Sequence, residues 1–124
     1  INAKYYSVDV TLRNLIVGNT SRDTGHILEN IVFLELIRRG YTVYVGQLAK
    51  GKIDFVAEKA GITEYYQVSE TVLDSNTLNR ELAPLEAIND QYSKFLLTLD
   101  ELNKNANYDG IQQRNVLEWL LESC

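Results

Sequence analysis

The chain has 124 residues, which is the length of one domain that can bury an apolar core without metal or disulfide cross-links. Hydrophobic residues make up 45% of it and charged residues 23%, a balance that excludes a disordered segment, and no apolar run approaches the roughly 20 residues needed to cross a bilayer. The net charge of −5 argues against tight, indiscriminate binding of nucleic acid, which usually requires a basic surface.

The sequence also carries signs of its compartment and of a longer parent protein. The one cysteine, Cys124, excludes an internal disulfide framework and fits a reducing compartment, and no signal peptide is visible, so we expect a cytoplasmic location. There is no methionine, and Ile1 is too bulky to follow an efficiently removed initiator. We therefore expect residues 1–124 to form a single domain cut from the C-terminal part of a longer chain.

Periodicity and capping residues divide the chain into strands and helices in a regular order. The clearest helix spans residues 25–39 and ends at Gly40; its apolar residues run around most of its circumference, which is typical of a largely buried helix. A second helix spans residues 75–89 and contains Pro84. Runs of β-branched, aromatic and aliphatic residues predict strands at 4–9, 41–45, 52–58, 62–70, 93–99 and 110–115, with short helices at 11–17 and 116–122 and a loop at 100–109.

This order reads β-α, then α-β-β-β-α-β, then β-α, without repeats, low-complexity segments or an internal linker. It predicts one α/β domain with a central mixed sheet flanked by helices. We expect the helix at 25–39 on one face of the sheet and the helix at 75–89 near it.

A hairpin in the middle of the chain places polar residues together. If residues 60–61 form a two-residue turn, Asp54 lies opposite Gln67 and Lys52 lies opposite Ser69. Because side chains alternate along a strand, these four residues then share one face of the hairpin. The opposite face carries apolar and aromatic side chains only: Ile53, Phe55, Ala57, Tyr66 and Val68.

A carboxylate beside an amide or a second acid suits a hard divalent cation such as Mg²⁺, which takes oxygen ligands and keeps several waters. Glu29 or Glu35 of the predicted helix at 25–39 can add a third oxygen ligand. These two residues lie about 120° apart around the helix axis, so only one of them can face the site. The alternative for each of these carboxylates is an ordinary hydrogen-bonded or surface position.

Several short motifs, taken in chain order, resemble the core of the PD-(D/E)xK nuclease superfamily. They are Gly25-x-x-x-Glu29, Arg39-Gly40-Tyr41, Ile53-Asp54-Phe55 and Gln67-x-Ser69. The resemblance implies a restriction-endonuclease-like core, in which a helix Glu, a strand Asp and a following (D/E)xK strand bind Mg²⁺ and activate water for phosphodiester hydrolysis. By position, Glu29 is the helix acid and Asp54 is the strand acid, while Gln67 replaces the second acid and Ser69 replaces the lysine.

A longer set of motifs is similar to one particular family, the C-terminal domain of unknown function attached to bacterial and archaeal AAA-type ATPases. The shared residues are Tyr5-Tyr6-x-x-Asp9-x-x-Leu12-Arg13-Asn14, Gly25-His26-x-Leu28-Glu29-Asn30-x-Val32-x-Leu34-Glu35-Leu36, Ile53-Asp54-Phe55-Val56-Ala57-Glu58 and Tyr108-Asp109-Gly110-Ile111. The resemblance implies a parent P-loop ATPase as the partner. The chain has no G-x-x-x-x-G-K-[ST] loop, so ATP would bind outside it.

The departures from the nuclease motif lower the expected activity. Gln67 offers a metal only a neutral carbonyl, and Ser69 cannot stabilise developing negative charge; losing one such electrostatic contribution typically costs about 10²–10³ in rate. Lys52, or Arg80 of the second helix, can take the place of the missing lysine. We expect Glu29, Asp54 and Gln67 to converge on one pocket with Ser69 at its edge.

The sequence therefore favours an accessory nuclease-fold domain, catalytically weak or inactive, that interacts with a protein partner or, weakly, with DNA or RNA. An active Mg²⁺-dependent endonuclease is the alternative. An oligomerisation module is the second alternative, and it requires an exposed apolar patch away from the polar residues. We expect Glu35 to point away from the pocket, toward packing or toward Arg39.

Overall fold

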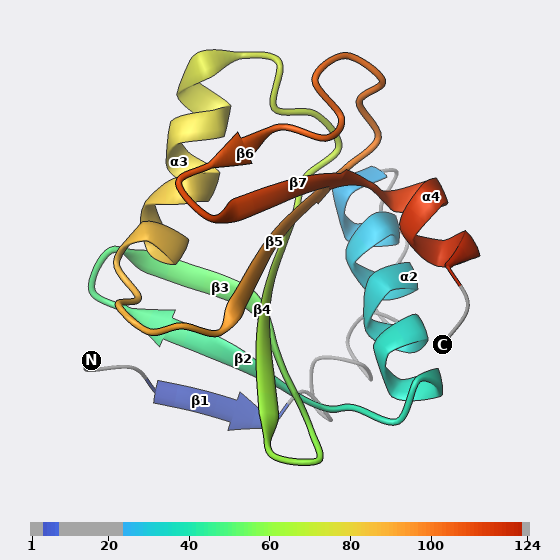
Figure 1. The fold of residues 1–124 in the computed structure, drawn as a ribbon, viewed down its shortest axis with the longest axis vertical. Helices are drawn as coiled ribbons and strands as arrows, with labels where there is room; N and C mark the ends of the chain where they lie inside the picture. The colour runs from blue at the N-terminus through green and yellow to red at the C-terminus, as the bar shows by residue number, and fades with distance from the viewer. Residues whose placement is uncertain (1–3, 8–23, 123–124) are drawn as a thin grey trace.

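The computed structural model describes residues 4–7 and 24–122, and its elements form a sheet with helices on both faces (Figure 1). Over the described residues the sheet has seven strands in the order β1-β2-β3-β4-β5-β7-β6. The strands are β1 (Lys4–Ser7), β2 (Thr42–Leu48), β3 (Gly51–Lys59), β4 (Ile62–Val68), β5 (Ser93–Thr98), β6 (Asn107–Tyr108) and β7 (Ile111–Asn115). The helices are α2 (Thr24–Arg38), α3 (Ser75–Glu86) and α4 (Val116–Leu121).

The predicted α/β class and the order of elements are confirmed over the described residues. Three details differ: the short strand β6 occupies part of the segment expected to be a loop, α3 ends at Glu86, three residues earlier than expected, and β2 runs to Leu48, three residues further than expected. The helix predicted at 11–17 lies outside the described residues. In the described part of the chain, no helix is both long enough and apolar enough to cross a membrane.

The sheet is mixed, as the sequence predicted, and the change of direction falls at its centre. The pairs β1–β2, β2–β3 and β3–β4 are antiparallel, the pairs β4–β5 and β5–β7 are parallel, and β6 is antiparallel to β7. A crossover connects the parallel strands β4 and β5, and α3 forms it.

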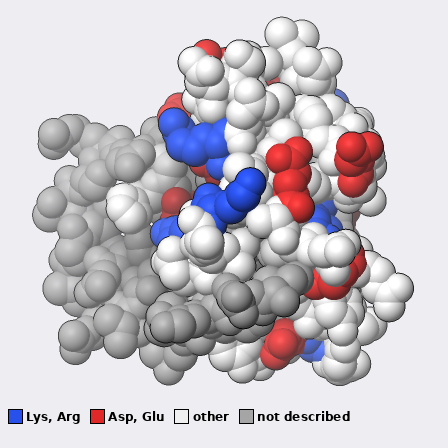
Figure 2. Space-filling view, turned by 90° about the vertical axis from the view of Figure 1, so that its left-hand side faces the viewer, with Lys and Arg blue, Asp and Glu red and all other residues white. Residues whose placement is uncertain are grey.

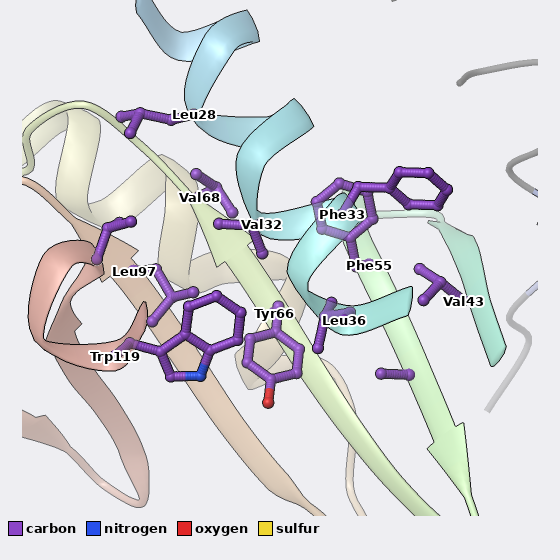
Figure 3. Close-up of a cluster of buried hydrophobic side chains, with 12 residues drawn as sticks. Leu28, Val32, Phe33, Leu36, Val43, Phe55, Tyr66, Val68, Leu97 and Trp119 are labelled. Atoms are coloured by element: carbon purple, nitrogen blue, oxygen red, sulfur yellow. The ribbon is translucent and has the colours of Figure 1, made fainter. Parts of the chain in front are cut away.

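Apolar side chains bury both faces of the sheet. On one face, Leu28, Val32 and Leu36 of α2 pack with Tyr66 and Trp119 (Figure 3). The other face is covered by α3. The buried residues of the apolar core on that face are Leu48, Ile53, Val56, Tyr65, Val72, Leu82, Leu85, Ile88, Leu96 and Ile111. The helix α3 therefore lies on the face of the sheet opposite α2. The expectation of one apolar and one polar hairpin face is wrong, because the face that α3 covers is lined by apolar side chains as well.

The two-residue turn between β3 and β4 is confirmed. Ala60 and Gly61 have φ values of 54° and 80°, the left-handed pair that a tight hairpin turn requires. The ladder then runs in the predicted register, from Lys59 opposite Ile62 to Phe55 opposite Tyr66.

A β-bulge interrupts the pairing of β3 with β2. Tyr44 pairs with Val56 and Gly46 pairs with Ile53, so Asp54 and Phe55 together face Val45 alone. The extra residue changes the alternation along β3 and turns Ile53 toward α3, while Phe55 stays on the α2 face. The prediction that Ile53 and Phe55 share a face is wrong for this reason. The bulge includes Asp54, the strand acid of the predicted site, so it affects the direction of that side chain.

Candidate functional site

The candidate site lies where β3 and β4 stop pairing through their main chains. Beyond Phe55 and Tyr66, side chains take over the hydrogen bonds: the main-chain N–H of Asp54 donates to Oε1 of Gln67 at 2.7 Å. In return, the N–H of Val68 donates to Oδ2 of Asp54 at 2.8 Å. The predicted neighbourhood of Asp54 and Gln67 is confirmed, and their side chains fill the gap between the two strands.

The predicted pairing of Lys52 with Ser69 is wrong because the strands have diverged at that point. Lys52 pairs with Gln47 of β2. The N–H of Ser69 donates to the Leu97 carbonyl at 3.0 Å, and its hydroxyl donates to the Thr71 carbonyl at 2.9 Å. The hydroxyl of Ser69 thus serves its own loop.

Asp54 is held in an environment that disfavours its charge. Its side chain is only 11% exposed. Burial is the main reason that its pKa rises from 3.8 to about 8; the charge of Glu29 is the next largest cause and that of Glu81 adds to it. The N–H of Val68 and the ammonium of Lys52, whose Nζ lies 4.0 Å from Oδ1, act in the opposite direction.

Glu81 of α3 is a member of the site that the sequence analysis did not identify. Burial raises its pKa, the charge of Glu29 raises it further, and the charges of Arg80 and Lys52 lower it. Its position on the helix offers a clue, because it lies between the apolar positions that α3 turns toward the sheet: Leu78, Leu82 and Leu85.

The charge of Glu29 on α2 therefore raises the pKa values of both Asp54 on β3 and Glu81 on α3, and the charge of Glu81 also raises that of Asp54. We refer to Glu29, Asp54 and Glu81 as the acidic cluster. Lys52 and Arg80, the two residues expected to replace the missing lysine, both supply positive charge that acts on it. Lys52 acts on both Asp54 and Glu81, whereas Arg80 acts on its neighbour Glu81.

Gln67 uses both ends of its side chain on main-chain groups. Its Oε1 accepts from Asp54, and its Nε2 donates to the carbonyls of Lys52 at 3.1 Å and Glu81 at 3.2 Å. The residue is 3% exposed. These contacts meet the hydrogen-bonding needs that burial of a carboxamide creates.

The prediction that Glu35 points toward Arg39 is confirmed. Its carboxylate forms ion pairs with Arg38 at 2.6 Å and with Arg39 at 2.7 Å, and the hydrogen bond from Arg38 is the main reason that its pKa falls to about 2. The guanidinium of Arg39 also donates to the Trp119 carbonyl at 2.7 Å and lies 4.3 Å from the centre of the Trp119 ring. This network attaches α2 to α4 and is structural.

The chemistry of the acidic cluster suits a hard cation, but its geometry does not present a formed metal site. Carboxylate oxygens are the ligands that Mg²⁺ prefers. Within residues 4–7 and 24–122, however, no three His, Cys, Asp or Glu side chains are grouped as metal ligands would be. The Gln67 oxygen, expected to be a third ligand, already accepts a hydrogen bond.

Basic and acidic side chains are mixed on the face shown in Figure 2. A small group of Lys and Arg side chains lies near its centre, with Asp and Glu side chains beside it. The described part of this face therefore carries no broad basic surface for a nucleic-acid backbone, in keeping with the net charge of −5.

One comparison with known proteins gives a relative. A protein of Haemophilus influenzae, described as an uncharacterized protein, is 40% identical to this chain over 121 residues. The alignment covers 98% of the chain and 29% of the relative, so the chain spans less than a third of that protein's length. No family model and no solved structure matches the chain.

Proposed function

We propose that this chain is a nuclease-fold accessory domain of a P-loop ATPase, with little or no phosphodiesterase activity of its own. The observation that carries the proposal is the buried carboxylate of Asp54, placed between β3 and β4 and affected by Glu29 and Glu81. The order α2-β2-β3-β4-α3-β5 supports it, because a restriction-endonuclease-like core has this α-β-β-β-α-β order.

The acidic cluster is proposed to bind a divalent cation weakly. Burial leaves two ways to neutralise its charge, namely proton uptake and cation binding. Glu29 and Glu81 belong to helices on opposite faces of the sheet and both act on Asp54, so their side chains would have to rotate for their oxygens to reach one ion. Because binding would require this rearrangement, we expect low affinity for Mg²⁺ and Mn²⁺.

Weak catalysis follows from the groups around the cluster. The hydroxyl of Ser69 is hydrogen bonded to Thr71, and the amide of Gln67 is hydrogen bonded to main-chain carbonyls, so neither is available to a scissile phosphate. The side chain of Lys52 is 53% exposed, so its ammonium is not held firmly toward the acidic cluster. A domain of net charge −5 also repels a polyanion.

The parent ATPase is proposed from the resemblance of the motifs and from the length of the relative. The chain corresponds to 29% of the Haemophilus influenzae protein, which leaves room in that protein for a nucleotide-binding domain. In this proposal ATP binds outside the chain, and the domain acts as an interaction module for a protein partner or, weakly, for nucleic acid.

The test combines a cleavage assay with a metal-binding assay on the 124-residue chain. Plasmid, single-stranded DNA and RNA should remain intact with Mg²⁺ or Mn²⁺, and calorimetry should detect weak Mn²⁺ binding. Asp54→Ala should abolish that binding, whereas Glu64→Ala should preserve it, because Glu64 bonds the Tyr66 hydroxyl at the other end of β4. Absence of Mn²⁺ binding in the unmodified chain would refute the proposed cation site.

An active endonuclease is the second candidate, and one observation favours it. Glu81 supplies a carboxylate that Gln67 lacks, and Lys52 supplies an ammonium that Ser69 lacks. This candidate predicts metal-dependent cleavage that is lost in both Glu81→Ala and Lys52→Ala. Cleavage lost in Asp54→Ala would replace the accessory role with this one.

An oligomerisation role is supported by a stripe of apolar side chains on α2. Ile27, Ile31 and Leu34 are 42%, 37% and 48% exposed, and their spacing places them on one side of the helix. If the stripe joins two copies, sedimentation should show a dimer that Leu34→Lys converts to a monomer.

A further inference from the structure

Gln67 contacts the main chains of three residues whose side chains make the site. Its Oε1 accepts from the N–H of Asp54, and its Nε2 donates to the carbonyls of Lys52 and Glu81. Two of these residues are on β3 and one is on α3, so a single buried side chain links the bulged strand to the helix that covers it.

The orientation of the carboxamide is fixed by its partners. Two carbonyl oxygens face Nε2 and one N–H faces Oε1, which uses both amide hydrogens and one lone pair of the oxygen. A glutamate at this position would turn a carboxylate oxygen toward two carbonyl oxygens and lose both donated hydrogen bonds. The site therefore requires an amide here, and the acid of the ordinary nuclease motif does not fit.

We infer that Gln67 is a positioning residue, which holds the main chains of Lys52, Asp54 and Glu81 next to one another. This inference rests on the proposed function for the cation, but it assigns Gln67 a role different from that of a metal ligand. Gln67 fixes the distance between β3 and α3 at the point where β3 and β4 no longer pair through their main chains. It acts on the ion through the residues it holds, as partners that orient metal ligands do.

The decisive variant is Gln67→Glu, because the two roles predict opposite results. A ligand would gain a charge and bind Mn²⁺ more tightly, whereas a positioning residue would lose its hydrogen bonds, and the affinity should fall about 10-fold or more. Gln113→Glu is the matched control: Gln113 is also buried, and its partners are Tyr108 and Thr98 on the far part of the sheet. We expect the control to keep the Mn²⁺ affinity of the unmodified chain, as measured by titration calorimetry.

A second variant covers the case in which Gln67→Glu does not fold. Gln67→Met keeps the volume without the hydrogen bonds and should also weaken Mn²⁺ binding, with Gln113→Met as its control. Tighter binding in Gln67→Glu, or unchanged binding in Gln67→Met, would overturn the inference.

A metal-free measurement separates this inference from the proposed function. If the unmodified chain binds no Mn²⁺, the proposed cation site fails, and amide hydrogen exchange then decides the role of Gln67. The N–H of Asp54 should exchange slowly in the unmodified chain and in Gln113→Met, and rapidly in Gln67→Met. Slow exchange of that N–H in Gln67→Met would show that Gln67 does not hold β3 in place.

Discussion

Asp54→Asn should remove a pH dependence that the buried carboxylate imposes on stability. In the folded chain the pKa of Asp54 is raised from 3.8 to about 8, with burial as the main cause. A raised pKa means that the folded state binds the proton more tightly than the unfolded state. The free energy of unfolding should therefore fall as the pH rises from about 4 to about 8, and it should level off above that range.

The size of this effect follows from the shift. Each pKa unit corresponds to about 1.4 kcal/mol, so Asp54 by itself sets a ceiling of about 5 kcal/mol at pH 8. Part of the shift comes from the charges of Glu29 and Glu81, so we expect Asp54 to contribute about half of that ceiling. Asparagine keeps an oxygen to accept from the N–H of Val68 and cannot ionise. Asp54→Asn should thus equal the unmodified chain near pH 4 and exceed its stability by about 2–3 kcal/mol at pH 8.

Urea unfolding at about pH 5.5 and about pH 8 measures the part of this difference that develops between these two pH values. Glu35→Gln is the control, because the pKa of Glu35 is lowered to about 2 and its contribution is present throughout that interval. The control should lose the same stability at both pH values. If Asp54→Asn retained the pH dependence of the unmodified chain, the assignment of the buried charge to Asp54 would be refuted.

Two further substitutions test the packing around the site. Arg39→Ala should lower the free energy of unfolding by about 3 kcal/mol, because it removes the ion pair with Glu35 and the contacts with Trp119; Arg39→Lys should recover less than half, since an ammonium cannot make the planar contacts of a guanidinium. Gly46→Ala should cost about 1–3 kcal/mol in the same urea assay, because its Cβ would lie 3.0 Å from the Cβ of Ile53 at the bulge. A neutral effect in either case would contradict the contact on which that prediction rests.

Local signals in the sequence were sufficient for most of the elements that the structure describes and for the hairpin register. The turn residues Ala60 and Gly61 adopt positive φ, which sets the pairing of β3 with β4 and brings Asp54 to Gln67. The spacing of Glu29 and Glu35 on one helix separates their roles, and Glu35 indeed pairs with Arg39. Each of these inferences depends on residues near one another in the chain.

The sequence could not reveal the features that depend on distant partners. The bulge at Asp54 arises from pairing with β2, and strict alternation along β3 gives no sign of it. Glu81 joins the site because α3 covers the sheet face opposite α2, a choice made by the crossover between β4 and β5. The burial of Gln67 against main-chain groups likewise requires both elements to be in place.

The change from antiparallel to parallel pairing at β4 has a consequence for the order in which the chain folds. Strands β2, β3 and β4 follow one another through short turns, so closing them costs little loop entropy, whereas β5 and β7 join only after longer connections have closed. Gln67 of β4 links the strands β2 to β4, which we expect to pair first, to α3, which lies in the longer connection between β4 and β5. The contacts of the acidic cluster should therefore form after the rate-limiting step, and substitutions there should act mainly on the rate at which the native chain unfolds.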